Sequence, residues 1–302
     1  MKLKFYFLIF FLLVLLNNLV FADGIGTTMF QILQMPTNAY DAALANSSSM
    51  GDNSSVVNPS LLPFVKKSII LSHAIYLQDT KYSIGALNIP IKKDSGLNIS
   101  FCYFDVGNID RTLEYNDGYI KDGSFNVNDK YLNVSYGKKI GQYFSAGASL
   151  KYIKQTIDDV SYSGFTASLS GLYFFSKDVY CNVGINNFGP AVNGYSLPTN
   201  LYCSIVGPIG EKNVGIIQLD DYYNDDIINC KIAVETGFED VLFLRLGYNA
   251  LLSKNYDGTN NDFITNLTLG AGLKFNKIFI DYAWLPKGDL GNVHMFTLRI
   301  DI

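Results

Sequence analysis

Within the last ten residues of the chain, 293–302, residues 296–302 alternate between apolar and polar side chains without interruption. The apolar members include Phe296, Leu298, Ile300 and Ile302, and the polar members are Thr297, Arg299 and Asp301. A strand points successive side chains to opposite faces, so this segment predicts a strand with one apolar and one charged face. The apolar face is the interior in a soluble sandwich, whereas in an outer-membrane barrel it faces lipid and the polar face lines the lumen.

The same period of two recurs in about fourteen segments, which predicts an all-β chain. The segment 263–275 is the longest of them. The predicted strands are 68–77, 82–91, 97–103, 131–136, 144–152, 165–174, 179–186, 201–206, 214–220, 230–236, 242–248, 263–275, 278–284 and 293–302.

The connections between these segments alternate in length after the first one. Residues 92–95 and 276–277 are short connections, whereas residues 105–128, 154–162 and 250–262 are long. Outer-membrane barrels pair short periplasmic turns with long outer loops, and a β-sandwich has no reason to sort its loops in this way. An open sheet edge cannot persist in hydrocarbon. We therefore expect residues 68–302 to form a transmembrane antiparallel β-barrel of about 14 strands.

The first 22 residues have the pattern of a secretory signal peptide. Lys2 and Lys4 precede the apolar run 5–16, and small or β-branched residues end at Ala22, so we expect the mature chain to begin at Asp23. A single membrane anchor is the alternative, but the run is shorter than the roughly 18–20 residues that a spanning helix needs. Export and a barrel together predict the outer membrane of a diderm bacterium.

The composition agrees with a membrane barrel. Hydrophobic residues make up 48% of the chain and charged residues only 17%, against roughly 25% in ordinary soluble domains. The 21 Tyr and 21 Phe include many at strand ends, where aromatic girdles meet the lipid headgroups. The formal net charge of −4 argues against nucleic acid as a partner. We expect outer-membrane lipid, lipopolysaccharide and the barrel assembly machinery as its surroundings.

Residues 23–67 do not alternate. Residues 29–33 and 38–45 are candidates for short helices, and Asn58 and Pro59 introduce the first strand. Side chains alone cannot fill a barrel of about 14 strands. We therefore expect this partly helical segment to act as a plug that partly fills the lumen.

Catalytic, cofactor and metal constellations are not apparent in the sequence. His73 and His294 are the two histidines, and we interpret His294 as a rim residue. No nucleophile elbow or phosphate loop occurs. We interpret the acidic pairs at 220–221 and 225–226 as part of a solvated outer surface, and a calcium-binding site is the alternative.

The four cysteines all fall within predicted strands. Cys102 is expected to face inward, and Cys181, Cys203 and Cys230 outward, as small apolar residues. A disulfide between Cys181 and Cys203, on neighbouring strands, stays open as an alternative.

Charged side chains on the predicted polar faces are candidates for the lumen lining. We expect Lys274 and Asp281 to lie diagonally on one hairpin, and Glu235 and Arg245 likewise on another. Buried ions need partners, so we interpret the set as an ion-pair network, with an anion-attracting lining around a transported solute as the alternative. The candidates are Lys151, Lys231, Glu235, Arg245, Lys274, Asp281 and Arg299.

Three segments carry a resemblance to a known family. The Asn58-Pro59 motif, the stretch FLRLGY at 243–248 and the stretch FIDYAWLPKGDLGNVH at 279–294 resemble the PorV/PorQ family, a branch of the FadL-like barrels. Residues 38–43 lack the Arg and the Met-Gly pair usual in that family. Many outer-membrane barrels end in Phe, whereas this chain ends in Ile302. The resemblance implies an accessory barrel of type IX-like protein secretion that contacts secreted proteins. The alternative that FadL-like barrels imply is a plugged channel for a hydrophobic small molecule.

Overall fold

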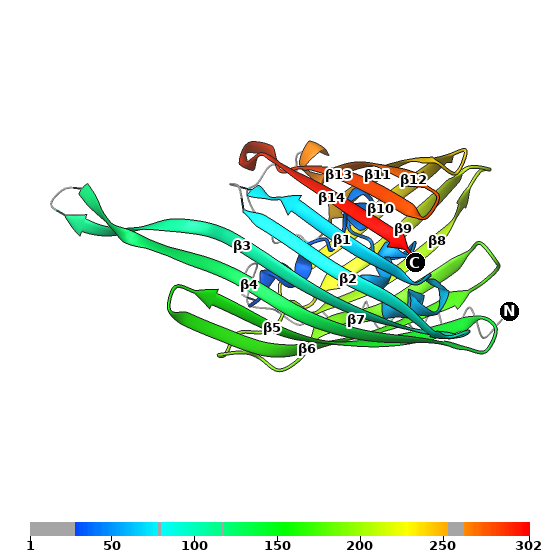
Figure 1. Cartoon of the computed structure of the whole chain (residues 1–302), viewed down its shortest axis with the longest axis horizontal. Helices are drawn as coiled ribbons and strands as arrows, with labels where there is room; N and C mark the ends of the chain where they lie inside the picture. The colour runs from blue at the N-terminus through cyan, green and yellow to red at the C-terminus, as the bar shows by residue number, and fades with distance from the viewer. Residues whose placement is uncertain (1–27, 78–79, 116–117, 253–262) are drawn as a thin grey trace.

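The structure, a computed structural model, describes residues 28–77, 80–115, 118–252 and 263–302. Fourteen antiparallel strands close into one barrel, because β1 pairs with β2 on one side and with β14 on the other (Figure 1). This confirms the predicted all-β barrel of about 14 strands. The expected signal peptide, 1–22, lies outside the described residues.

The strands follow one another around the barrel in chain order. Their bounds are β1 Ser68–Ile75, β2 Lys81–Lys92, β3 Ser95–Tyr115, β4 Gly118–Ile140, β5 Phe144–Ile157, β6 Val160–Phe174, β7 Tyr180–Phe188, β8 Asn200–Ile209, β9 Asn213–Tyr222, β10 Ile227–Phe238, β11 Leu242–Leu251, β12 Leu267–Phe275, β13 Ile278–Pro286 and β14 Asn292–Asp301.

The helices are short, and most of them precede the barrel. No described helix has both the length and the apolar character required to cross a bilayer. The bounds are η1 Gln31–Gln34, α2 Ala39–Ala43, η2 Asn53–Val56, η3 Pro59–Phe64, η5 Phe263–Asn266 and η6 Gly288–Leu290.

The strand faces follow the predicted alternation. On β1, Ile69 and Leu71 are exposed on the outer surface, whereas Ser68, Ile70 and Ser72, which alternate with them, are buried toward the lumen. Outer side chains are apolar because they meet lipid, and inner side chains are mostly small or polar because they meet the N-terminal segment or water. This face assignment positions every lumen residue described below.

The two ends of the barrel differ. The turn end carries the connections 93–94 and 276–277 together with the start of β1 and the end of β14. The loop end carries the connections 189–199 and 223–226. We use these two names for the ends throughout.

Two connections expected to be long loops are instead strand. β3 and β4 remain paired to Tyr115 and Gly118 and project well beyond the barrel, and β5 and β6 remain paired to Ile157 and Val160 (Figure 1). Their outer parts lack the apolar alternation because water surrounds both faces there. β12 is shorter than expected, since residues 263–266 form η5, and β4 is the longest strand.

An arginine on the outer face of β12 tests the orientation of the strands. Leu269 is 38% exposed on that face, so Leu269→Arg should cost about 2–4 kcal/mol in folding into a bilayer. Asn249→Arg on β11 is the control, because Asn249 lines a cavity of the lumen. Refolding yield into lipid vesicles measures both variants, and equal yields would contradict this orientation.

Candidate functional site

The N-terminal segment, residues 28–67, lies in the lumen and forms a plug. Its backbone donates hydrogen bonds to hydroxyl oxygens of the wall: Ala39 N to Thr297 Oγ1 at 2.8 Å, Ala45 N to Thr268 Oγ1 at 3.1 Å and Ser60 N to Ser170 Oγ at 2.9 Å. A buried backbone N–H needs a partner, and the inward Ser and Thr side chains provide it. The plug is therefore held by β6, β12 and β14 together.

Inward glycines allow the plug backbone to lie directly against the wall. A Cβ at Gly137 on β4 would be 2.1 Å from the Pro59 carbonyl oxygen, and one at Gly96 on β3 would be 2.4 Å from that of Leu62. A Cβ at Gly270 on β12 would be 2.4 Å from the Ala43 Cβ. These contacts were not predicted from the sequence, although glycines on the polar face of a strand are a signal for close approach of another backbone.

The predicted plug motif, Asn58 and Pro59, lies at the turn end of the lumen. Asn58 is fully buried, its Oδ1 accepts a hydrogen bond from Ser60 N at 3.2 Å, and its Nδ2 donates to Asn182 Oδ1 on β7 at 3.1 Å. The motif therefore starts η3 and at the same time attaches it to the wall.

Asp41 joins three parts of the plug through hydrogen bonds to its carboxylate. Its carboxylate accepts hydrogen bonds from Asn38 Nδ2 at 2.9 Å, from Ser48 Oγ at 3.2 Å and from Ser54 Oγ. The side chain of Asn38 in turn caps α2 by accepting a bond from the backbone N–H of Asp41. These bonds join α2, the following loop and η2 into one folded unit.

Arg245 on β11 connects the wall to the plug. Its guanidinium contacts Glu235 on β10 at 2.6 Å and Asp281 on β13 at 2.7 Å, and it lies 4.2 Å from the centre of the Tyr40 ring in the plug. Asp281 also accepts a hydrogen bond from Asn53 Nδ2 in the plug at 3.1 Å. The register explains the first pair, because Glu235 and Arg245 are directly opposite across β10 and β11.

Arg299, near the turn end, contacts Asp52 in the plug at 3.3 Å and Asp301 at 3.3 Å. Lys231 on β10 lies 3.0 Å from Asp220 on β9 and donates to the plug carbonyl of Asn46. Each cation thus neutralises a carboxylate of the wall. Arg299 also contacts the Asp52 carboxylate of the plug, and Lys231 also contacts the Asn46 carbonyl of the plug.

The prediction of an ion pair between Lys274 and Asp281 is wrong. Asp281 lies opposite Gly272, and the space above this glycine admits the Arg245 guanidinium, which forms the ion pair with the Asp281 carboxylate. Lys274 lies opposite Phe279 near the turn and places its ammonium 5.8 Å from that ring. Strand register alone could not show this, because Arg245 belongs to a third strand.

Two aspartates expected on a solvated surface are buried. Asp220 and Asp225 are each 1% exposed. Asp225 accepts hydrogen bonds from Thr28 Oγ1 at 2.8 Å and from Gln34 Nε2 at 2.7 Å, so the 223–226 connection folds onto the plug. Within the described residues, no cluster of three or more His, Cys, Asp or Glu could hold a metal ion.

The cysteines are free thiols. Cys102 is fully buried and faces the lumen, whereas Cys181, Cys203 and Cys230 are partly buried. Cys203 lies opposite Val183 rather than Cys181, so the strand register does not bring the two sulfurs face to face.

A chamber of about 600 Å³ occupies the lumen between the plug and the loop end. The plug forms its floor through residues that include Gln31, Gln34 and Pro36. Its wall combines apolar groups with polar ones. The apolar side chains include Tyr76, Phe104, Val127, Ile227 and Leu285, and the polar ones include Asp129, Gln155, Asn229, Asn249 and Lys287.

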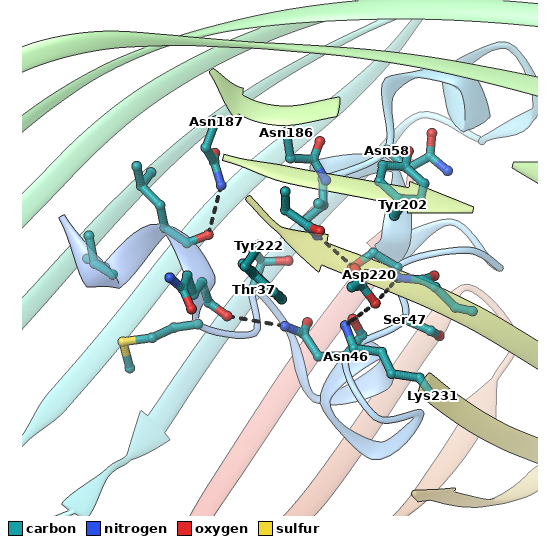
Figure 2. Close-up of a pocket in the computed structure, with 18 of the residues that line it drawn as sticks. Thr37, Asn46, Ser47, Asn58, Asn186, Asn187, Tyr202, Asp220, Tyr222 and Lys231 are labelled. Atoms are coloured by element: carbon teal, nitrogen blue, oxygen red, sulfur yellow. Dashed lines mark hydrogen bonds and ion pairs between the residues drawn. The ribbon is translucent and has the colours of Figure 1, made fainter. Parts of the chain in front are cut away.

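A smaller crevice of about 50 Å³ continues between the plug and the wall formed by β7–β10 (Figure 2). The crevice and the chamber share Gln34, Asn46 and Lys231, so they meet where Asn46 Nδ2 donates to the Gln34 carbonyl. Its lining is mainly amide, hydroxyl and charged. Lys151 and Asp220 belong to it as well.

The wall is irregular beside β7. Regular pairing of β6 with β7 ends at Leu169 and Ile185, whereas β6 begins much closer to the loop end. The connection 189–199 covers this part of β6, since Val192 packs against Gly164 and Leu197 is buried in the cluster that holds Phe30. Met29 N of the plug also donates to Ser196 O at 2.9 Å.

The barrel is similar to solved structures of hydrocarbon channels. The toluene transporter TodX of Pseudomonas putida has a TM-score of 0.62 at 12% identity, covering 94% of this chain and 98% of that chain. The toluene transporter TbuX of Ralstonia pickettii has a TM-score of 0.61 at 10% identity, covering 88% and 98%. The monoaromatic hydrocarbon channel CymD has 0.60 at 10%, covering 87% and 96%.

No family model and no curated protein sequence matches the chain. At such low identity the structural likeness establishes the barrel fold alone. The PorV/PorQ branch is not shown by these matches. The neighbours named are described as channels and transporters.

An added methyl group at Gly137 tests the contact between plug and wall. Gly137→Ala would drive a Cβ into the Pro59 carbonyl, so we expect η3 to shift at a cost of about 1–3 kcal/mol. Gly85→Ala on β2 is the control, because its Cβ would lie 3.8 Å from Leu71 Cδ2. Protease cleavage of the plug in the folded barrel should accelerate only for Gly137→Ala, and unchanged protection would contradict the contact.

Removal of the Arg245 charge tests the ion network. Arg245→Met leaves Glu235 and Asp281 without their shared cation, and we expect about 3–5 kcal/mol of lost stability. Lys277→Met, at an exposed turn, should change stability by no more than about 0.5 kcal/mol. Urea unfolding in detergent micelles measures both, and equal midpoints would show that the network contributes nothing.

Proposed function

We propose that this protein is a plugged outer-membrane channel of the FadL type that admits small hydrophobic molecules. The observation that carries the proposal is the chamber of about 600 Å³ that lies between the plug and the loop end. Its volume is within the range of roughly 300–1,000 Å³ that is usual for small-molecule sites.

The chamber lining supports a small molecule with an apolar body. Met35, Tyr76, Phe104 and Leu285 supply apolar surface, and the aromatic rings offer faces and edges to a planar solute. The FadL-like fold supports the same proposal, since TodX, TbuX and CymD carry names that describe monoaromatic or toluene transport for those proteins.

The irregular wall beside β7 supports a route out of the lumen by way of the crevice, because Asn186 and Asn187 of β7 line the crevice rather than the chamber. In the segment 189–199, Leu197 inserts among plug and wall residues, and backbone hydrogen bonds join the segment to Met29 and Tyr223 rather than to a neighbouring strand. Its displacement would break few ladder hydrogen bonds, whereas separating any fully paired strands elsewhere would break many.

Uptake of toluene tests the proposal. The full-length protein is placed in the outer membrane of a host without hydrocarbon channels, and labelled toluene uptake is compared with that of the empty membrane. Ile227→Trp should narrow the chamber and lower uptake severalfold, because Ile227 lines it. Ile228→Trp is the matched control, since Ile228 is exposed on the outer face.

Toluene uptake no faster than through the empty membrane would contradict the channel proposal. That outcome is also the one expected of a secretion partner, which would instead change the retention of exported proteins. Equal uptake by the Ile227→Trp and Ile228→Trp variants would exclude the chamber as the entrance.

A further inference from the structure

Lys151 on β5 is an exception among the buried cations of the lumen. Four basic side chains in the described part of the chain are buried: Lys151, Lys231, Arg245 and Arg299. The last three each lie within 3.3 Å of a carboxylate oxygen. Lys151 has no carboxylate within 4.0 Å among the described residues.

The Lys151 ammonium is held only by neutral groups. It is 8% exposed, it donates to Asn187 Oδ1 on β7 at 2.8 Å, and it lies 5.8 Å from the centre of the Tyr131 ring. An ammonium has three donors, and burial without a counter-charge is costly. The barrel therefore carries an uncompensated positive charge at this point.

The same crevice contains polar atoms without partners. Asn186 Oδ1, Asn200 Oδ1 and Ser47 Oγ have no hydrogen-bond partner among the described residues, and each residue is more than nine-tenths buried. Figure 2 shows Asn186 and Ser47 beside the crevice together with Asn187 and Lys231. Buried polar groups in native proteins are nearly always satisfied. The two amide oxygens accept hydrogen bonds and therefore require a donor such as water, whereas Asn186 Nδ2, which has no acceptor among the described residues, can donate to an anion.

The size of the crevice limits that occupant. About 50 Å³ holds a few atoms of a polar group and cannot hold a whole drug-sized solute. The chamber of about 600 Å³ adjoins it at Asn46 and Gln34. A solute can thus place a charged end in the crevice and its apolar body in the chamber.

We propose that Lys151, together with Asn186, forms an anion subsite that binds the carboxylate of a small organic acid. The carboxylate would neutralise Lys151 and accept a hydrogen bond from Asn186 Nδ2, while the rest of the molecule lies in the chamber. The inference rests on the proposed channel function and narrows its solutes to those with an acidic end.

Benzoate and benzyl alcohol provide the test, because they share a ring and differ in charge. Titration calorimetry on the full-length protein in detergent should show that benzoate binds, and that Lys151→Met weakens it at least about tenfold. Benzyl alcohol should bind both proteins equally. Lys274→Met is the control, since Lys274 also projects from the inner wall but lies outside the crevice.

A second variant, Asn186→Leu, tests the subsite independently in case Lys151→Met does not fold. Asn186→Leu retains Lys151 and should weaken benzoate at least about fivefold, because it removes a hydrogen bond to a charged group. The thermal midpoint of Lys151→Met should equal or exceed that of the wild type, since the substitution removes an unpaired buried charge. Equal benzoate affinity in the wild type and Lys151→Met would overturn the proposal.

A competition experiment with inorganic phosphate distinguishes a site for organic carboxylates from a site for inorganic anions. Displacement of benzoate by an equal concentration of inorganic phosphate would overturn the assignment to an organic acid. Toluene uptake is measured with the same variants. Retained toluene uptake without benzoate binding overturns only the anion subsite, whereas benzoate binding without toluene uptake overturns only the channel proposal.

Discussion

Hydrocarbon offers no hydrogen-bond partner to a peptide group, and the rest of this structure depends on that constraint. Every strand must pair on both sides, so the sheet closes where β1 meets β14. A closed barrel of this size encloses more space than its own side chains can fill. The plug occupies that space, and its polar backbone in turn requires a polar inner wall.

The wall meets this requirement with two kinds of inward residue. Hydroxyl groups such as those of Thr268 and Thr297 accept bonds from plug N–H groups, and glycines such as Gly137 leave room for plug carbonyls. Several charged side chains of the wall are neutralised by ion pairs. Arg245, for example, lies between Glu235 and Asp281. The turn end of the lumen is consequently packed, and open volume remains mainly toward the loop end.

The open volume has a graded chemistry. The chamber presents aromatic and aliphatic side chains such as Tyr76 and Phe104 beside amides, whereas the lining of the crevice below it is mainly polar. A purely apolar solute would find more partners in the chamber than in the crevice. The gradient therefore favours solutes with two unlike ends, and Lys151 sets the sign of the charge at the polar end.

The sequence determined the barrel and the face of each strand. Period-two alternation records whether a side chain faces lipid or lumen, and lipid exposure enforces it, so the strand number and the inward position of residues such as Arg245 and Asp281 could be predicted. The polar parts of β3 and β4 that extend beyond the barrel were not predicted as strand, because water on both faces imposes no alternation of apolar and polar residues.

Tertiary structure alone decided which lumen residues meet. Asp281 pairs with Arg245 from another hairpin instead of Lys274 from its own, and Asp220 and Asp225 are buried against other polar groups rather than solvated. Alternation states a face and carries no information about contacts across a lumen or with a plug. Those contacts depend on closure of the barrel and on the space left by glycines such as Gly272.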